Sequence, residues 1–117
     1  ATPQKSYALA AGCALRKNRD NDAYDFYERA LRLDPNYLVA IMGMAQVRFK
    51  RGQLAESRAL VSRYNKLVEP TAESLWLALR IERKLGDKVA ENSYATQLRR
   101  QFPGTPEYQE FIKGQYD

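Results

Sequence analysis

The sequence predicts an all-α protein made of three successive helical pairs and a short capping helix. Prolines stand at Pro35, Pro70 and Pro103, with spacings of 35 and 33, so one period is about 34 residues. The turn sequence KRGQ at 50–53 returns 34 positions later as KLGD at 84–87. Each period also holds two segments whose apolar residues recur every three or four positions, which is the spacing of one helix face.

The turn inside each pair is expected at Asn18, Gly52 and Gly86, which are 34 residues apart. Gly and, after it, Asn accept the left-handed conformation that ends a helix. In chain order, the helices are expected at about 5–17, 20–33, 37–51, 54–68, 72–85, 88–101 and 106–113.

The apolar face of each pair can be read from the same spacing. The first pair carries Tyr7, Ala10, Ala11, Ala14, Ala23, Tyr27, Ala30 and Leu31. The second pair carries Ile41, Met44, Ala45, Leu54, Val61, Tyr64 and Leu67. The third pair carries Leu75, Ala78, Leu79, Leu85, Val89, Ala90, Tyr94 and Leu98. The alanines let paired helices approach closely. Because one pair cannot bury its apolar face alone, neighbouring pairs are expected to stack.

The capping helix has a clear start signal at its N-terminus. Thr105 can accept a hydrogen bond from the first turn, Pro106 suits the first helical position, and Glu107 favours the positive end of the helix dipole. The chain is therefore expected to form a single domain, with repeats at about 4–37, 38–71 and 72–105 and a cap at about 106–113.

The composition disfavours an enzyme. The 117 residues contain no His and a single Cys, so the common general base, the usual nucleophilic triads and most zinc sites are absent. Six glycines stand in no phosphate-binding motif, and no catalytic, metal or cofactor residue is assigned. A net charge of +5 comes from 19 basic and 14 acidic residues along every helix, as on a solvated face. The longest charge-free apolar stretch, 37–47, is shorter than the roughly 20 residues of a membrane span.

The period and its residues resemble the tetratricopeptide repeat. In the first repeat the motif is carried by Tyr7, Ala10, Ala11, Ala23, Tyr27, Ala30 and Pro35. In the second it is carried by Ile41, Met44, Ala45, Gly52, Ser57, Val61 and Pro70, and in the third by Leu75, Ala78, Leu79, Gly86 and Pro103. Glu91 stands where the third repeat would carry a small residue. The resemblance implies a right-handed α-α superhelix of three helical pairs plus the capping helix.

The third repeat carries a narrower resemblance. The segments 74–81, 85–87, 93–94, 97–100, 102–104 and 107–111 together resemble the C-terminal half of the type IV pilus biogenesis lipoproteins, the pilotins of the PilF/PilW family. This resemblance implies a scaffold that assists assembly or outer-membrane localisation of the secretin, the pore through which pili emerge. It also implies a lipid anchor and further repeats upstream, which would make this chain a soluble fragment of a protein at the periplasmic side of the outer membrane.

Tetratricopeptide arrays bind partners on the concave face formed by the first helix of each pair. Positions that point away from the core of each pair mix apolar and cationic side chains, a composition that suits an apolar, partly acidic segment of a partner protein. The candidate partner-binding residues are Leu15, Arg16, Met42, Gln46, Phe49, Lys50, Trp76, Arg80 and Arg83. No small-molecule substrate is expected.

Several alternatives stay open at this stage. Met42, Phe49 and Trp76 would have no binding role if they pack against the capping helix or a neighbouring repeat. Cys13, among alanines, is expected as a small buried thiol or as the partner of an upstream cysteine. The chain could be an adaptor of another assembly. A further hypothesis, which its eight tyrosines and positive charge allow, is a nucleic-acid-binding helical repeat.

Overall fold

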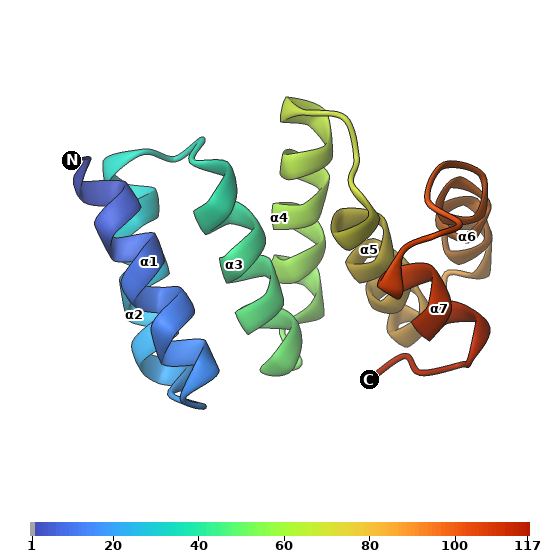
Figure 1. Ribbon diagram of the computed structural model, residues 1–117, viewed down its shortest axis with the longest axis horizontal. Helices are drawn as coiled ribbons and strands as arrows, with labels where there is room; N and C mark the ends of the chain where they lie inside the picture. The colour runs from blue at the N-terminus through green and yellow to red at the C-terminus, as the bar shows by residue number, and fades with distance from the viewer. Residues whose placement is uncertain (1) are drawn as a thin grey trace. The chain divides into compact units, whose positions relative to one another are not determined.

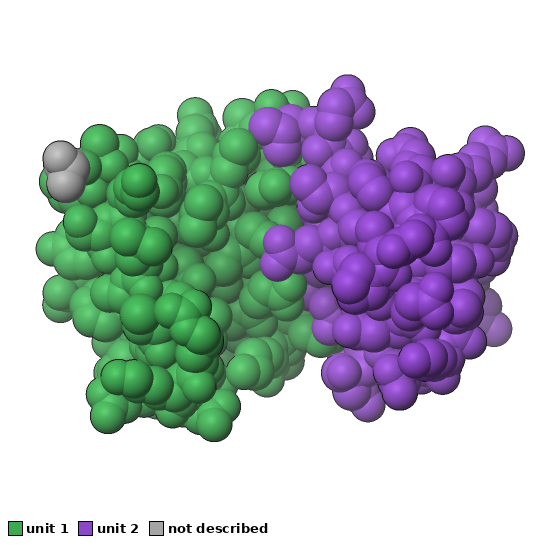
Figure 2. All heavy atoms as spheres, in the orientation of Figure 1, with its two compact units in different colours: residues 1–67 green, residues 68–117 purple. Residues whose placement is uncertain are grey.

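The computed structural model describes residues 2–117, which form seven α-helices and no β-strand (Figure 1). Every helix end lies within two residues of its expected position. The bounds are α1 Pro3–Arg16, α2 Asp20–Leu33, α3 Leu38–Lys50, α4 Leu54–Leu67, α5 Ala72–Leu85, α6 Lys88–Gln101 and α7 Pro106–Ile112. The described residues fall into two compact units, an N-terminal unit that ends at Leu67 and a C-terminal unit, Val68–Asp117 (Figure 2). The boundary lies close to the expected start of the third repeat; the single-domain organisation stays a prediction.

The 34-residue period of the sequence is also seen in the conformation of the backbone. Asn18, Gly52 and Gly86 have φ angles of 59°, 75° and 83°, in the left-handed region. Each donates its N–H three residues back, to the carbonyls of Leu15, Phe49 and Arg83, at 3.0, 3.0 and 3.2 Å. The following residue donates five residues back, which is the paired bonding that closes a helix after a left-handed residue. This confirms the turns expected inside each pair.

Small residues set the spacing of the helices in the N-terminal unit. Ala11, Ala23 and Ala30 are completely buried, and they lie in a core that also holds Tyr27, whose side chain is 5% exposed. A Cβ placed on Gly43 of α3 would overlap the ring of Tyr27 from α2, so glycine permits the contact between these two helices. The α3–α4 pair is tied by Ser57, which is completely buried and donates its hydroxyl to the carbonyl of Ala45 at 2.8 Å.

The C-terminal unit is built on α5. Leu75, Trp76 and Leu79 of this helix form a core with Ala95 and Leu98 of α6. Partly buried aromatic side chains complete the core: Tyr94, Phe102, Tyr108, Phe111 and Tyr116.

The start of α7 agrees with the sequence prediction. The Thr105 hydroxyl accepts a hydrogen bond from the N–H of Tyr108 at 3.3 Å. Pro106 lies at the first helical position, and Glu107 lies in the first turn.

Candidate protein-binding face

The nine candidate residues all lie on the first helix of a pair, as the sequence predicted, but in two different units. Leu15 and Arg16 belong to α1, and Met42, Gln46, Phe49 and Lys50 belong to α3, so six of the nine are in the N-terminal unit. Trp76, Arg80 and Arg83 belong to α5 in the C-terminal unit.

In the N-terminal unit, half-buried apolar side chains stand next to exposed cations. Leu15 and Phe49 occupy equivalent positions 34 residues apart and are both partly buried. The next residues, Arg16 and Lys50, are both exposed at the C-terminal ends of α1 and α3. This pattern repeats in both pairs, so the ends of these helices present an apolar surface bordered by positive charge.

The two cations have only weak contacts within the chain. Arg16 donates to the sulfur of Cys13 at 3.2 Å, and the Lys50 ammonium lies 3.3 Å from a carboxylate oxygen of Asp20. The Lys50 and Asp20 side chains are 52% and 40% exposed, so water screens their attraction. Both cations are therefore only weakly held by these contacts.

Two of the expected apolar anchors are buried. Met42 is 5% exposed and Trp76 is 3% exposed, and Ala8, the equivalent residue of the first pair, is 4% exposed. This position of the repeat therefore packs inside the protein. Of the alternatives left open for Trp76, the structure shows packing against the capping helix.

Cys13 also differs from its simplest expectation. Its thiol is free and exposed rather than buried among the alanines. The reason is its position on the face of α1 opposite the completely buried Ala11 and the buried Ala14, which carry the close helix contact.

Trp76 is enclosed by aromatic and charged side chains of its own unit. Its ring meets Phe111 of α7 edge-on, with 6.2 Å between centroids, and lies 5.7 Å from the ring of Tyr116. Its indole N–H donates to the carboxylate of Glu110 at 3.0 Å. The guanidinium of Arg80 lies 5.1 Å from the indole centroid. The indole N–H thus has an acceptor, and the ring is almost completely buried within its own unit.

Burial is the main influence on the pKa of Arg80. It lowers the pKa of the guanidinium from its ordinary value, and the carboxylates of Glu110, Glu73, Asp117 and Glu107 oppose this effect. Arginine stays charged at neutral pH even so. Arg80 therefore contributes a positive charge that carboxylates of the chain already compensate.

Sequence reasoning missed the part played by the last residues. The guanidinium of Arg83 lies 3.9 Å from the centroid of the Tyr116 ring and 3.2 Å from a Glu91 oxygen. Lys84 lies 3.6 Å from the carboxylate of Asp117. The available signal was Gly114, a glycine just after the capping helix, like Gly86 after α5.

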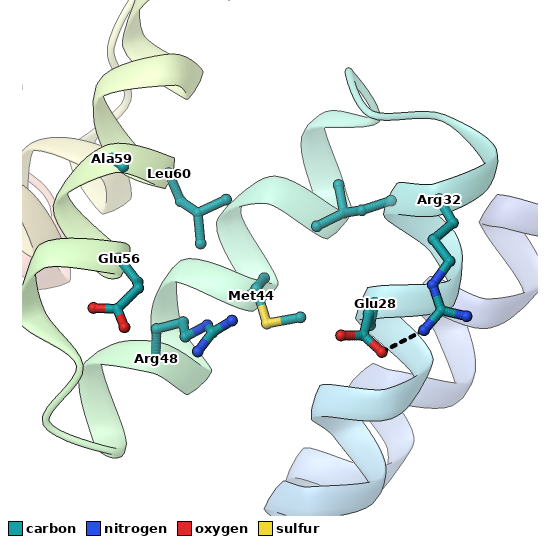
Figure 3. A pocket seen from close by; sticks show the side chains of 8 residues that line it. Glu28, Arg32, Met44, Arg48, Glu56, Ala59 and Leu60 are labelled. Carbon is teal, nitrogen blue, oxygen red and sulfur yellow. Dashed lines mark hydrogen bonds and ion pairs between the residues drawn. The ribbon is translucent and has the colours of Figure 1, made fainter.

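A concave surface lies in the N-terminal unit, and none of the predicted binding residues lines it. It has a volume of about 520 Å³, and Figure 3 shows its side chains coming from α2, α3 and α4. Met44, Leu31 and Leu60 give it an apolar floor, and its rim carries the Glu28–Arg32 ion pair at 2.6 Å. Arg48 also lines this surface. Its guanidinium donates hydrogen bonds to the hydroxyl of Tyr24 at 2.8 Å and to the side-chain oxygen of Gln53 at 2.7 Å.

Among residues 2–117, no group of three or more His, Cys, Asp or Glu side chains is arranged to hold a metal ion. None of the described helices combines the length and the apolar character that crossing a membrane requires.

A family model of the tetratricopeptide repeat matches residues 14–79, and the helical pairs have the turns and period of that repeat. The chain belongs to the tetratricopeptide repeat family. This confirms the first resemblance and the all-α fold class.

This tetratricopeptide protein is also related to known pilus proteins. It is 30% identical over 98 residues to the type IV pilus assembly protein PilF of Pseudomonas aeruginosa, a match that covers 84% of the chain and 39% of that protein. The solved structure of Pseudomonas aeruginosa PilF superposes with a TM-score of 0.85 at 26% identity, covering 95% of this chain and 50% of that one. The crystal structure of PilW, a widely conserved type IV pilus biogenesis factor, superposes with a TM-score of 0.81 at 26% identity, covering 95% and 51%. The chain therefore spans 39% to 51% of the length of these relatives.

Proposed function

We propose that this protein is a non-catalytic scaffold of type IV pilus biogenesis that binds the secretin and assists its assembly or its localisation in the outer membrane. The observation that carries the proposal is the match of 84% of the chain to a type IV pilus assembly protein. The superposition of 95% of the chain on PilF and on PilW supports it. Tetratricopeptide repeats present helix faces that recognise extended or helical segments of other proteins.

The face of α1 and α3 in the N-terminal unit is the proposed binding surface. Leu15 and Phe49 offer partly buried apolar contacts, and Arg16 and Lys50 offer exposed positive charge beside them. Arginine pairs with carboxylates in a fixed geometry, and apolar anchors surrounded by polar groups dominate the energy of interfaces. The face therefore suits an apolar partner segment with nearby acidic residues. Gln46 lies on α3, three residues before Phe49 and four before Lys50, so it adds a polar group to the same side of this helix.

The location of the protein follows from the same proposal. A scaffold for the secretin would act at the periplasmic side of the outer membrane, attached by a lipid anchor on further repeats upstream. The coverage of 39% to 51% of the relatives supports a longer protein.

A nucleic-acid partner is the alternative that the structure disfavours most. Several arginines that could stack on bases are engaged with tyrosines of the chain. Arg48 and Arg51 lie 4.8 and 4.0 Å from the centroid of the Tyr24 ring, and Arg29 lies 5.8 Å from that of Tyr7. Such pairs already use both the aromatic face and the cation.

The test is a pull-down from the cell envelope of the source organism, with the secretin identified by mass spectrometry. The protein is immobilised as the 117-residue chain and as the longer protein, at low and high salt. We expect both forms to retain the secretin, and Phe49→Ala to reduce retention by tenfold or more. Val89→Ala is the control, because Val89 is 83% exposed on α6 and its truncation removes exposed apolar surface away from the proposed face.

The outcomes separate the alternatives. Retention of the secretin that is equal for wild type, Phe49→Ala and Val89→Ala would contradict the proposed face. Retention of nucleic acid in place of the secretin, lost as salt rises, would contradict the function itself.

A further inference from the structure

Residues 114–117 turn back from α7 onto α5. Gly114 has a φ of +71°, and its N–H donates to the carbonyl of Phe111 at 3.0 Å. The N–H of Gln115 donates to the carbonyl of Glu110 at 2.9 Å. This is the same helix ending found at Asn18, Gly52 and Gly86, so backbone hydrogen bonds fix the direction in which the last residues leave α7.

The segment contacts α5 at two points. The ring of Tyr116 lies 5.7 Å from the indole of Trp76 and 3.9 Å from the guanidinium of Arg83, so it has an aromatic neighbour and a cation. One residue later, the carboxylate of Asp117 lies 3.6 Å from the ammonium of Lys84. A hollow of about 300 Å³ between the segment and α5 is lined by Arg80, Arg83, Lys84, Gly114, Tyr116 and Asp117.

These contacts can be exchanged for those of another chain. The Asp117 and Lys84 side chains are 96% and 45% exposed, so their ion pair is solvated and weak. The attachment depends mainly on the Tyr116 ring, which is itself only partly buried. Aromatic and cation–π contacts of this kind are individually small.

The chemistry of α5 defines what could replace the segment. Trp76 and Arg83 offer an aromatic surface and a guanidinium for a ring, and Lys84 offers a positive charge for a carboxylate one residue later. Arg80 is less available to a new acidic group, because carboxylates from α5, α7 and the end of the chain already act on it.

We propose that this face of α5 binds a segment of a partner protein in which an aromatic residue is followed directly by an acidic residue, and that residues 114–117 occupy the face until such a segment displaces them. This inference rests on the proposed function, because two of its residues, Trp76 and Arg83, belong to the candidate binding set. It adds the chemistry of the partner segment and a competition within the chain.

The test uses a synthetic peptide that carries a Tyr-Asp pair in a Gly-Ser context, titrated into the 117-residue chain. Trp76 is the only tryptophan of the sequence, so its fluorescence and its single indole N–H resonance report on this face. We expect Tyr116→Ala to bind the peptide about tenfold more tightly than wild type, which corresponds to a wild-type segment docked about nine-tenths of the time.

Two variants and two peptides serve as controls. Arg83→Ala in the Tyr116→Ala background should lose the added affinity, whereas Arg99→Ala, an exposed arginine of α6, should keep it. Peptides in which Tyr is replaced by Ala, or Asp by Asn, should bind several-fold more weakly. Circular dichroism and the dispersion of the NMR spectrum establish that each variant is folded.

Three results would overturn the inference. Equal affinity for wild type and Tyr116→Ala would show that the segment does not compete. Absence of peptide binding to folded Tyr116→Ala would show that α5 is not a binding face. A doubled mass of the wild-type chain that Tyr116→Ala reverses would show that the segment docks on a second copy.

The proposed function has its own readout. Secretin retention that depends on Phe49 while peptide affinity is independent of Tyr116 would retain the proposed function and refute this inference.

Discussion

Gly43 offers the sharpest test of how the N-terminal unit is packed. It lies in the middle of α3, where alanine would ordinarily stabilise a helix by about 1 kcal/mol relative to glycine. In this structure, a Cβ at Gly43 would overlap two ring atoms and the hydroxyl oxygen of Tyr27, a residue that is 5% exposed and lies in the core. Overpacking of this kind costs about 1–3 kcal/mol, because the ring or the helix must shift.

Gly12 provides a matched comparison within the same unit. It lies inside α1, and a Cβ there would meet only the end of the Arg16 side chain at 3.7 Å, an ordinary contact. Gly12→Ala and Gly43→Ala gain the same helix propensity, and only the second creates a clash. We therefore expect the free energy of unfolding of Gly43→Ala to be lower than that of Gly12→Ala by about 1–3 kcal/mol.

The assay is urea unfolding followed by far-ultraviolet circular dichroism, which reports on the helices of both units. The fluorescence of Trp76 would not suffice, because this residue lies in the C-terminal unit. A Tyr27→Leu background, which removes the ring, should reduce the difference between the two variants. Equal stability of Gly12→Ala and Gly43→Ala would refute the argument that α2 and α3 require glycine at this position.

Three further predictions follow from single contacts. Ser57→Ala should lower the free energy of unfolding by about 1 kcal/mol, measured by urea denaturation, because it leaves the buried carbonyl of Ala45 without its hydroxyl donor. Asn18→Ala should destabilise by about 1–2 kcal/mol in the same assay while Asn18→Gly should not, since only alanine is strained at a φ of 59°. Asp20→Asn should change stability by less than about 1 kcal/mol, and the change should shrink at 1 M salt, because its ion pair with Lys50 is exposed.

The repeating part of the structure could be predicted because its causes are local. The left-handed turn at Asn18 follows from its spacing to Gly52 and Gly86, and the start of α7 follows from Thr105 and Pro106. Each of these features depends on a few residues that are neighbours in the chain. The sequence alone is therefore enough to predict where they lie.

The candidate face was harder to predict because burial depends on distant residues. Helical spacing predicts Trp76 on the side of α5 away from the core of its pair, whereas the structure buries it in a core with α6 residues and covers it with α7 and Tyr116. The last residues have no helical period, so Tyr116 gave no signal of its own. Gly43 was missed for a related reason: a glycine inside a helix indicates only a local cost until the facing Tyr27 ring is known.

Photo-cross-linking tests the central claim most directly. A photoreactive amino acid is placed at the position of Phe49 in the longer protein, in cells that assemble type IV pili, with the position of Val89 as the control. We predict a covalent product with the secretin from position 49 and none from position 89. A secretin product from position 89 alone, or none from either position while the protein is present and folded, would contradict the proposed binding face.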